Sequence, residues 1–417
     1  MSQFILRTTS SRGVPNRSER GPAVLAALVL LTMVMGPVSE VSGSHSRAES
    51  MAGAMKVELV RDDLSRVSGS LVSISESQIT LLLRDSDGGE SERSFPRDNC
   101  LALNTLRDPS GGSHEGMLAL TDGQMIPGRP LDSDEQTRGD TLRWQHPWLG
   151  QLAVEIDSIN RVVFRAGAQP PPAGDGDALL LANGDVIEGF LLSLGDPVEL
   201  EVERGDGPEV SSIPRERVAA ATLLNPVRPM RGTWAWFGDG TILKAQQLTS
   251  EDGRWAQVLT REESRGEQTV SLDDLLAIIL DTERMRMLTD LAPLSIEGPE
   301  TRYRLPEPIV EGIGRHAPRS SMTLSGPITV RYALPSGAAR FASEVSIPDR
   351  ARQWTEMTLI IRVDDREVLR EKLDRDRPEM TVNEVLDGTE LTIELKQGGA
   401  GPIHTVLRWS NPRLLID

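Results

Sequence analysis

One short pattern recurs along this chain and constrains its fold more than any other feature. An apolar run is followed by a turn with an Asp-Gly or Asn-Gly pair and then by further apolar residues, in 116–128, 177–189 and 232–245. A looser copy occupies 56–71. Turns of this kind between apolar runs are the strongest short-range signal for a β-hairpin. The pattern therefore predicts an antiparallel hairpin at each copy.

The four hairpins continue into longer units that resemble one another. Each unit runs on through a second apolar segment to a proline or acidic corner and a final short strand. With about five strands, such a unit has the size of a small SH3-like or Sm-like barrel. We expect an all-β protein with tandem barrel repeats at 55–108, 115–167, 178–228 and 231–285, and a stiff polar linker at 168–177.

The last third of the chain, 294–417, has a different texture. Its apolar residues alternate with polar ones over longer runs, as in 328–334, 357–365 and 391–397. Alternation of this kind is typical of strands with one buried face. Several such strands in little more than a hundred residues, without a long helical pattern, predict a β-sandwich. The segment 282–294 before it is either a short helix or an extended linker.

This last third resembles the NPCBM family of carbohydrate-binding modules, which have a galactose-binding-like jelly-roll sandwich. The family's Gly-x-Gly-x-His motif is matched by Gly312, Gly314 and His316, followed by Ala317 and Arg319-Ser320, and its late tryptophan by Trp409. The resemblance implies a jelly-roll sandwich that binds carbohydrate. The matching segments fall in order at 312–324, 328–347, 358–373, 386–399 and 407–414.

Sugar-binding sites use flat aromatic or guanidinium groups for the apolar ring faces and polar groups for the hydroxyls. The resemblance and the position of loops favour four candidates, with Trp354 in a polar segment between two strands. The candidate carbohydrate-binding residues are His316, Arg319, Trp354 and Arg408.

The other tryptophans have more local expectations. Trp234 and Trp236 alternate along one strand and are expected to fill a barrel core, and Trp409 is expected to be buried in the sandwich. Trp144 and Trp148 flank a His-Pro pair, and this segment is a candidate for a small exposed aromatic patch.

The N-terminal segment 1–45 has the features of a targeting sequence. Four arginines precede an uncharged stretch from Gly21 to Ser39, and small residues follow it. This is typical of a secretory signal peptide. An uncleaved anchor is the alternative, because a bilayer is spanned by roughly 20 apolar residues. Either reading predicts a secreted, periplasmic or cell-envelope protein whose only membrane contact would be this segment if it is uncleaved.

Charge and cysteine content limit the partners. The formal net charge is −17, with acidic residues spread along the chain, which argues against nucleic acid because phosphate binding needs clustered Lys and Arg. Cys100 is the only cysteine, so an internal disulfide and a cysteine-based zinc site are excluded. An exported chain so poor in cysteine favours a bacterial cell envelope. No cofactor is expected. A structural calcium ion in the sandwich is an open alternative.

We therefore expect a non-enzymatic exported protein that binds envelope or extracellular glycan through its last third. A first alternative is a scaffolding protein of the envelope that binds protein partners through its β repeats. A second is a hydrolase that uses His316 and Ser320, which lie four residues apart. Hydrolytic serines usually lie in a Gly-x-Ser-x-Gly elbow, and the chain has none.

Overall fold

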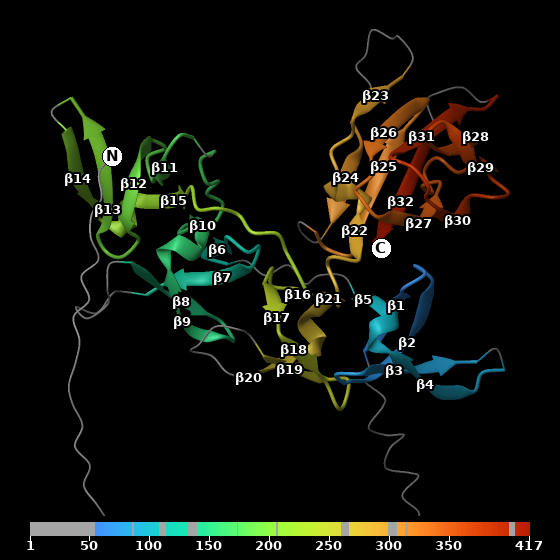
Figure 1. The fold of residues 1–417 in the computed structure, drawn as a ribbon, viewed down its shortest axis with the longest axis horizontal. Helices are drawn as coiled ribbons and strands as arrows, with labels where there is room; N and C mark the ends of the chain where they lie inside the picture. Colours follow the sequence, from blue (N-terminus) through green and yellow to red (C-terminus); the bar gives the residue numbers. More distant parts are fainter. Residues whose placement is uncertain are drawn as a thin grey trace, which may run out of the picture. The chain divides into compact units, whose positions relative to one another are not determined.

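The computed structural model describes residues 55–85, 87–107, 114–131, 140–172, 174–205, 207–259, 267–298, 307–312, 316–399 and 405–417. The segment 1–45, which is expected to be a targeting sequence, and Gly314 lie outside these residues. Gly53–Asp417 forms one unit. Every regular element described is a β-strand or a single-turn 3-10 helix, which confirms the all-β prediction (Figure 1). Within this part of the chain no helix has the length and apolar character needed to cross a membrane.

The first repeat is a five-stranded antiparallel sheet. Its strands are paired in the order β5-β1-β2-β3-β4, so the chain makes a meander and then returns to its first strand. A one-turn 3-10 helix makes the return. The elements are β1 (Lys56–Arg61), β2 (Arg66–Ile74), β3 (Gln78–Arg84), β4 (Glu90–Pro96), η1 (Arg97–Asn99) and β5 (Cys100–Thr105).

The same element order occurs twice more, and a fourth copy has one additional strand before its 3-10 turn. Each copy begins with a predicted hairpin and ends with a 3-10 turn and a short strand. The second copy has β6 (Gly116–Leu120), β7 (Met125–Pro130), β8 (Thr141–His146), β9 (Gly150–Glu155), η2 (Ile156–Ser158) and β10 (Ile159–Val163). The third has β11 (Asp177–Leu181), β12 (Val186–Ser193), β13 (Val198–Arg204), β14 (Gly207–Ile213), η3 (Arg215–Arg217) and β15 (Val218–Thr222). The fourth has β16 (Thr233–Phe237), β17 (Ile242–Ala245), β18 (Gln247–Thr249), β19 (Trp255–Leu259), β20 (Glu267–Ser271), η4 (Leu272–Asp274) and β21 (Leu275–Ile279).

The glycine that closes two of the sequence patterns has a steric role. A Cβ on Gly128 would lie 2.2 Å from the backbone oxygen of Gln145, and a Cβ on Gly189 would lie 2.3 Å from that of Glu201. Both distances are far below van der Waals contact. Glycine therefore lets the second strand of the hairpin approach the third strand closely.

The repeats associate through their last strands. β5 pairs with β21, and β10 pairs with β15, in both cases antiparallel. All residues of β5, β15 and β21 are buried, which explains why these strands are mostly apolar rather than alternating. Among the described residues no pairing joins the fourth strand of a repeat to its fifth. The expected closed barrels are therefore not shown; the structure shows sheets that continue from one repeat into another.

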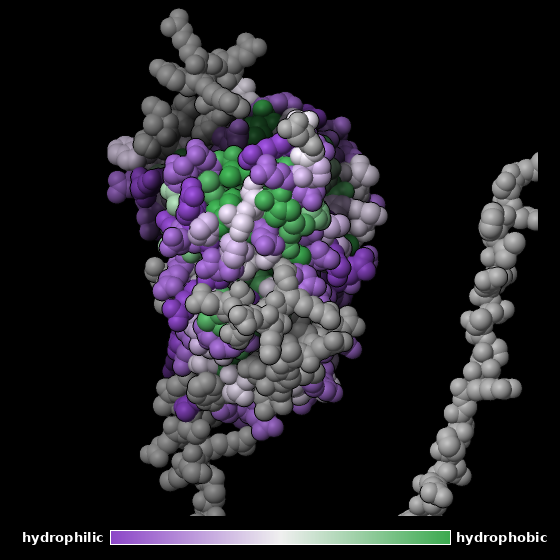
Figure 2. Space-filling model, turned by 90° about the vertical axis from the view of Figure 1, so that its left-hand side faces the viewer, coloured by the Kyte–Doolittle hydropathy of each residue, from purple (hydrophilic) through white to green (hydrophobic). Residues whose placement is uncertain are grey.

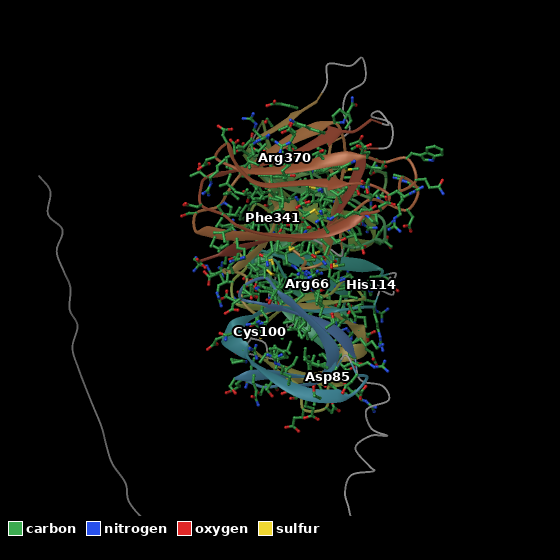
Figure 3. The ribbon with its side chains drawn as sticks, turned by 90° about the vertical axis from the view of Figure 1, so that its right-hand side faces the viewer. Arg66, Asp85, Cys100, His114, Phe341 and Arg370 are labelled. Carbon is green, nitrogen blue, oxygen red and sulfur yellow. The ribbon has the colours of Figure 1, made fainter. Side chains whose placement is uncertain are left out.

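The single cysteine begins one of these buried strands. Cys100 is 2% exposed, its thiol donates to the backbone oxygen of Pro96 at 3.2 Å, and it is labelled in Figure 3. Burial raises the pKa of the thiol to about 11.

We expect Cys100 to resist thiol reagents in the native protein. With a pKa of about 11, roughly a thousandth of the thiol is thiolate at pH 8, and the thiolate is the reactive form. Labelling by a chromogenic disulfide should be slow at pH 8, should accelerate as the pH rises towards 10, and should become fast in concentrated urea. Rapid labelling of the folded chain at pH 8 would contradict the burial of this strand.

The last third forms two antiparallel sheets. One has the order β24-β25-β32-β27-β30, with β22 (Met285–Met287) also on β32, and the other has the order β23-β26-β31-β28-β29. This is the expected β-sandwich. The strands are β23 (Ser295–Glu297), β24 (Ile309–Gly312), β25 (Ser320–Ser325), β26 (Ile328–Ala333), β27 (Ala338–Ser346), β28 (Met357–Val363), β29 (Arg366–Leu373), β30 (Glu379–Val385), β31 (Glu390–Gln397) and β32 (Val406–Ile416).

The core of the sandwich contains the tryptophan expected there. Trp409 has no exposed surface, and its ring centroid lies 5.9 Å from that of Phe341 on the neighbouring strand. The segment before the sandwich is extended, with β22 and the one-turn helix η5 (Leu288–Asp290). The linker alternative for 282–294 is thus closer to the structure than a helix.

Two expectations for the other tryptophans need correction. Trp144 is fully buried and Trp148 is partly buried, with its indole N–H donated to Asp239 at 2.9 Å, so they form no exposed patch. Trp234 and Trp236 are buried, but not in the core of their own repeat. They belong to a separate apolar cluster that also contains Met285, which precedes the sandwich, and Ala342 and Leu415 of the last third. Alternation along β16 places Ala235 and Phe237 in the core of the repeats instead.

Candidate functional site

His316 is fixed in a turn before β25. Its φ of +57° lies in the left-handed region, its backbone N–H donates to Asp290 Oδ1 at 3.3 Å, and its Nδ1 lies 3.0 Å from Asp290 Oδ2. Half of its side chain is exposed. A non-glycine residue in this region is uncommon, and here the two contacts with one carboxylate stabilise it.

Ser320, the partner of His316 in the hydrolase alternative, has other contacts. Its hydroxyl lies 2.8 Å from the hydroxyl of Thr289, and its backbone N–H donates to Asn411. Within the described part of the chain no hydrogen bond joins His316 to Ser320. The two side chains are held by different neighbours.

The two candidate arginines have different surroundings. The guanidinium of Arg319 donates to the backbone oxygen of Arg107, which follows β5. Arg408 lies on β32, where its guanidinium donates to the hydroxyl of Ser321 at 3.3 Å and lies 3.7 Å from a carboxylate oxygen of Glu311. About half of the Arg408 side chain is exposed.

Trp354 is presented by a tight turn between β27 and β28. Backbone N–H groups in the turn donate from Ala351 to Pro348, from Arg352 to Asp349 and from Trp354 to Ala351, and the hydroxyl of Thr355 also donates to Ala351. Thr355 is buried, whereas Trp354 is 62% exposed. The turn is therefore anchored, and its indole faces solvent.

The strand registers do not bring the four candidates together. β25 and β27 both pair antiparallel with β32, so they run in the same direction on its two sides. His316 and Arg319 precede the first residue of β25, and Trp354 follows the last residue of β27. These two groups thus lie towards opposite ends of the sheet. Arg408 lies between them, opposite Thr323 and Ser346.

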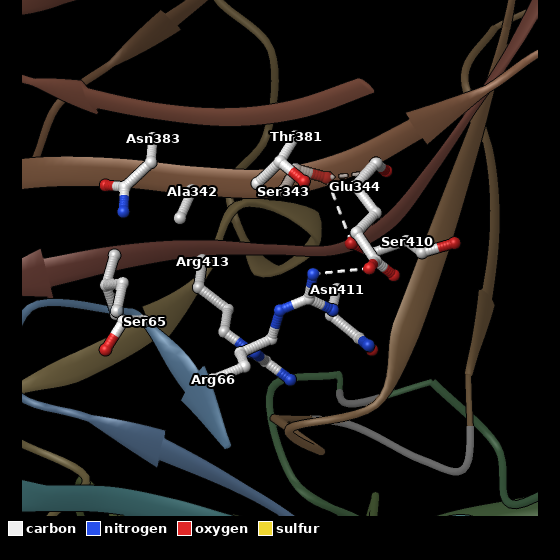
Figure 4. Close-up of a pocket in the computed structure, with 11 residues that line it drawn as sticks. Ser65, Arg66, Ala342, Ser343, Glu344, Thr381, Asn383, Ser410, Asn411 and Arg413 are labelled. Atoms are coloured by element: carbon white, nitrogen blue, oxygen red, sulfur yellow. Dashed lines mark hydrogen bonds and ion pairs between the residues drawn. The ribbon is translucent and has the colours of Figure 1, made fainter. Parts of the chain in front are cut away.

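A polar pocket lies elsewhere, where β2 meets the sheet of β27, β30 and β32. Its volume is about 260 Å³, and Figure 4 shows its lining side chains. None of the four predicted residues lines it. The lining residues are Leu64, Ser65, Arg66, Ala342, Ser343, Glu344, Thr381, Asn383, Ser410, Asn411 and Arg413.

A β-bulge in β32 shapes one wall of this pocket. Ala342 on β27 pairs with Arg413 on β32, and Glu344 pairs with Ser410. One residue lies between the two paired positions on β27 and two lie between them on β32, so β32 has one extra residue. Asn411 in this bulge has a φ of +50°. A bulge breaks the regular alternation of a strand and redirects its side chains. Asn411 and Arg413 thereby line the same pocket as Ser410.

Four charged groups are linked at the base of the pocket. Glu58 on β1 accepts from Arg66 at 3.1 Å and from Arg413 at 3.2 Å, and Arg66 also donates to Glu344. The hydrogen bond from Arg66 is the main reason why the pKa of Glu344 lies below its usual value. Arg413 is almost fully buried, and desolvation lowers the pKa of its guanidinium. Its Nε has no hydrogen-bond partner among the described residues.

No pattern in the sequence predicts this pocket. Its residues come from 64–66, 342–344, 381–383 and 410–413, and no local pattern connects segments so far apart. The bulge at Asn411-Pro412 is the one feature with a local cue, since proline interrupts a strand ladder. Among the described residues there is no group of three or more His, Cys, Asp or Glu side chains placed to hold a metal ion.

Three solved structures are similar to this chain at low identity. One is a CBM51 module from Clostridium perfringens GH95 in complex with methyl-galactose (10% identity, 31% of this chain and 99% of that chain, TM-score 0.26). Another holds CBM51 and INT domains of Clostridium perfringens ZmpB, with GlcNAc (11% identity, 42% of this chain and 42% of that chain, TM-score 0.26). A third holds tandem CBM51 modules of a family 98 glycoside hydrolase from Streptococcus pneumoniae (9% identity, 87% of this chain and 88% of that chain, TM-score 0.26).

No family model and no curated protein matches the chain. The comparisons therefore assign this chain to no family.

Proposed function

We propose that this protein is an exported, non-catalytic glycan-binding protein whose C-terminal sandwich carries the binding surface. The observation that carries the proposal is the exposure of Trp354 on an anchored turn. The apolar face of a sugar ring stacks on an exposed indole, and a turn held by hydrogen bonds loses little entropy on binding.

Polar groups beside the indole support this proposal. Arg352 forms an ion pair with Asp349 at 3.3 Å in the same turn, and Glu356 forms one with Lys372 at 2.9 Å. All four side chains are at least two-fifths exposed and can exchange water for sugar hydroxyls. Flat apolar surface next to such donors and acceptors is the composition that a glycan requires.

We expect Trp354→Ala to weaken glycan binding by about 30-fold, the effect of losing a tryptophan hot spot worth about 2 kcal/mol. The full chain would be screened on an array of bacterial and animal oligosaccharides and polysaccharides, and the hits measured by calorimetry. Phe190→Ala, which removes another exposed aromatic side chain, is the matched control and should bind as the parent does. Glycan binding that survives in Trp354→Ala would contradict this surface, and an array without hits would contradict the function.

One observation favours the scaffolding alternative. On the third repeat, Phe190, Glu201 and Val210 pair across β12, β13 and β14, and Phe190 and Val210 are more than half exposed. Glu199 and Glu203 lie on the same face of β13. Figure 2 faces this side of the molecule and shows hydrophobic residues among hydrophilic ones. Such a face suits a partner segment with basic and apolar side chains, and a partner lost in Phe190→Ser, without any glycan binding, would favour this function.

A further inference from the structure

We infer that the pocket between β2 and the β27–β30–β32 sheet binds a single neutral sugar residue. This inference rests on the proposed glycan-binding function and assigns it a second subsite, away from Trp354. The pocket is a built feature of the fold, because residues from the first repeat and from the sandwich form it together.

The apolar surroundings hold the two sides of the pocket together. Leu64 and Ala342 line the pocket and also belong to the apolar cluster that contains Trp234, Trp236 and Leu415. The ion pairs of Glu58 with Arg413 and of Arg66 with Glu344 cross the same junction. The walls are therefore positioned before a ligand enters, which lowers the entropic cost of binding.

The charges of the pocket favour a neutral ligand. Two guanidinium groups, on Arg66 and Arg413, are matched by two carboxylates, on Glu58 and Glu344. An anionic ligand would have to displace Glu344 from Arg66, and a cationic ligand would have to displace Arg66 from a carboxylate. A neutral ligand requires neither exchange.

The polar groups of the pocket match hydroxyl chemistry. Ser343, Thr381 and Ser410 contribute hydroxyls, and Asn383 and Asn411 contribute amides, so donors and acceptors are mixed on the same walls. A sugar hydroxyl both donates and accepts and therefore suits these walls.

The size of the pocket limits the ligand to one ring. Pockets for drug-sized ligands have volumes of roughly 300–1,000 Å³, whereas this pocket has about 260 Å³. The left-handed backbone of Asn411 at its wall is an observed departure from regular strand geometry, and departures of this kind cluster at binding sites.

The test is calorimetric titration of the full chain with glucose, galactose, N-acetylglucosamine and glucuronate. We expect saturable binding of at least one neutral sugar and none of glucuronate. Thr381→Val and Asn383→Ala change exposed residues at the pocket and should each weaken that binding about three- to tenfold, the effect of one hydrogen bond. Glu371→Gln, which alters an ion pair with Arg377 outside the pocket, should leave it unchanged.

The outcomes separate this inference from the proposed function. If polymeric glycans bind in a Trp354-dependent manner but no neutral monosaccharide binds, the pocket inference is wrong and the function stands. Monosaccharide binding that is insensitive to both Thr381→Val and Asn383→Ala would also overturn the pocket inference. Binding of glucuronate in preference to the neutral sugars would overturn the charge argument. If polymeric glycans do not bind at all, the proposed function itself fails.

Discussion

Replacing Trp409 by alanine should lower the free energy of unfolding by about 3–5 kcal/mol, the range for a large buried aromatic side chain. Trp409 lies on the central strand β32, between Met322 on β25 and Val345 on β27, and it has no exposed surface. Its removal deletes the contact with Phe341 and leaves a cavity that neighbouring strands cannot close. Urea unfolding followed by far-ultraviolet circular dichroism would measure the loss.

Trp354→Ala is the matched control for this prediction. It makes the same chemical change at a position that is 62% exposed, and we expect its free energy of unfolding to stay within about 0.5 kcal/mol of the parent. Trp409→Phe should cost less than Trp409→Ala, because it retains most of the ring and removes a buried indole N–H that has no acceptor among the described residues. Equal losses for the two alanine variants would contradict the assigned burial.

The contrast between these two tryptophans could be predicted from the sequence. Trp409 lies in an apolar strand segment, and Trp354 lies among charged residues between two strands, so local pattern alone separates a core residue from a surface residue. The hairpins at the Asp-Gly and Asn-Gly turns were predictable for the same reason, since turn chemistry acts within a few residues. β6 pairs with β7, and β11 with β12, as expected.

The association of the repeats could not be predicted in this way. β5 pairs with β21 although more than 170 positions separate Cys100 from Leu275. A continuously apolar strand is consistent both with a closed barrel and with a strand buried between two neighbours. The pattern of Trp234 and Trp236 was ambiguous for the same reason, since both faces of β16 are covered.

The candidate site shows the same limit. His316, Arg319, Trp354 and Arg408 were chosen by a linear resemblance, and the strand registers distribute them along the sandwich. The pocket depends instead on Arg66 and Arg413, which are brought together by Glu58 across the junction between the first repeat and the sandwich. Each of these charged residues would be taken for a surface residue in the sequence, because burial of a charge is specified only by its distant partner.

This dependence makes the stability of the protein sensitive to the charge of Glu58. Its carboxylate bonds Arg66 and Arg413 and also accepts from Asn104 at 3.4 Å, and its side chain is 13% exposed. Glu58→Gln would leave the guanidinium of Arg413 buried without a carboxylate. We expect the free energy of unfolding to fall by about 3–5 kcal/mol, as when one partner of a buried ion pair is removed.

The double variant Glu58→Gln, Arg413→Met separates two causes of lost stability. One is the loss of the ion pair itself, and the other is the burial of the Arg413 charge without its partner. The double variant removes the uncompensated guanidinium together with its partner, so it should be more stable than Glu58→Gln alone. Glu371→Gln is the control: it breaks the exposed pair with Arg377, and exposed pairs contribute at most about 1 kcal/mol. Urea unfolding at pH 7 would compare the three variants. If Glu58→Gln were no more destabilising than Glu371→Gln, the network at the junction would be dispensable, and the walls of the pocket would need another means of support.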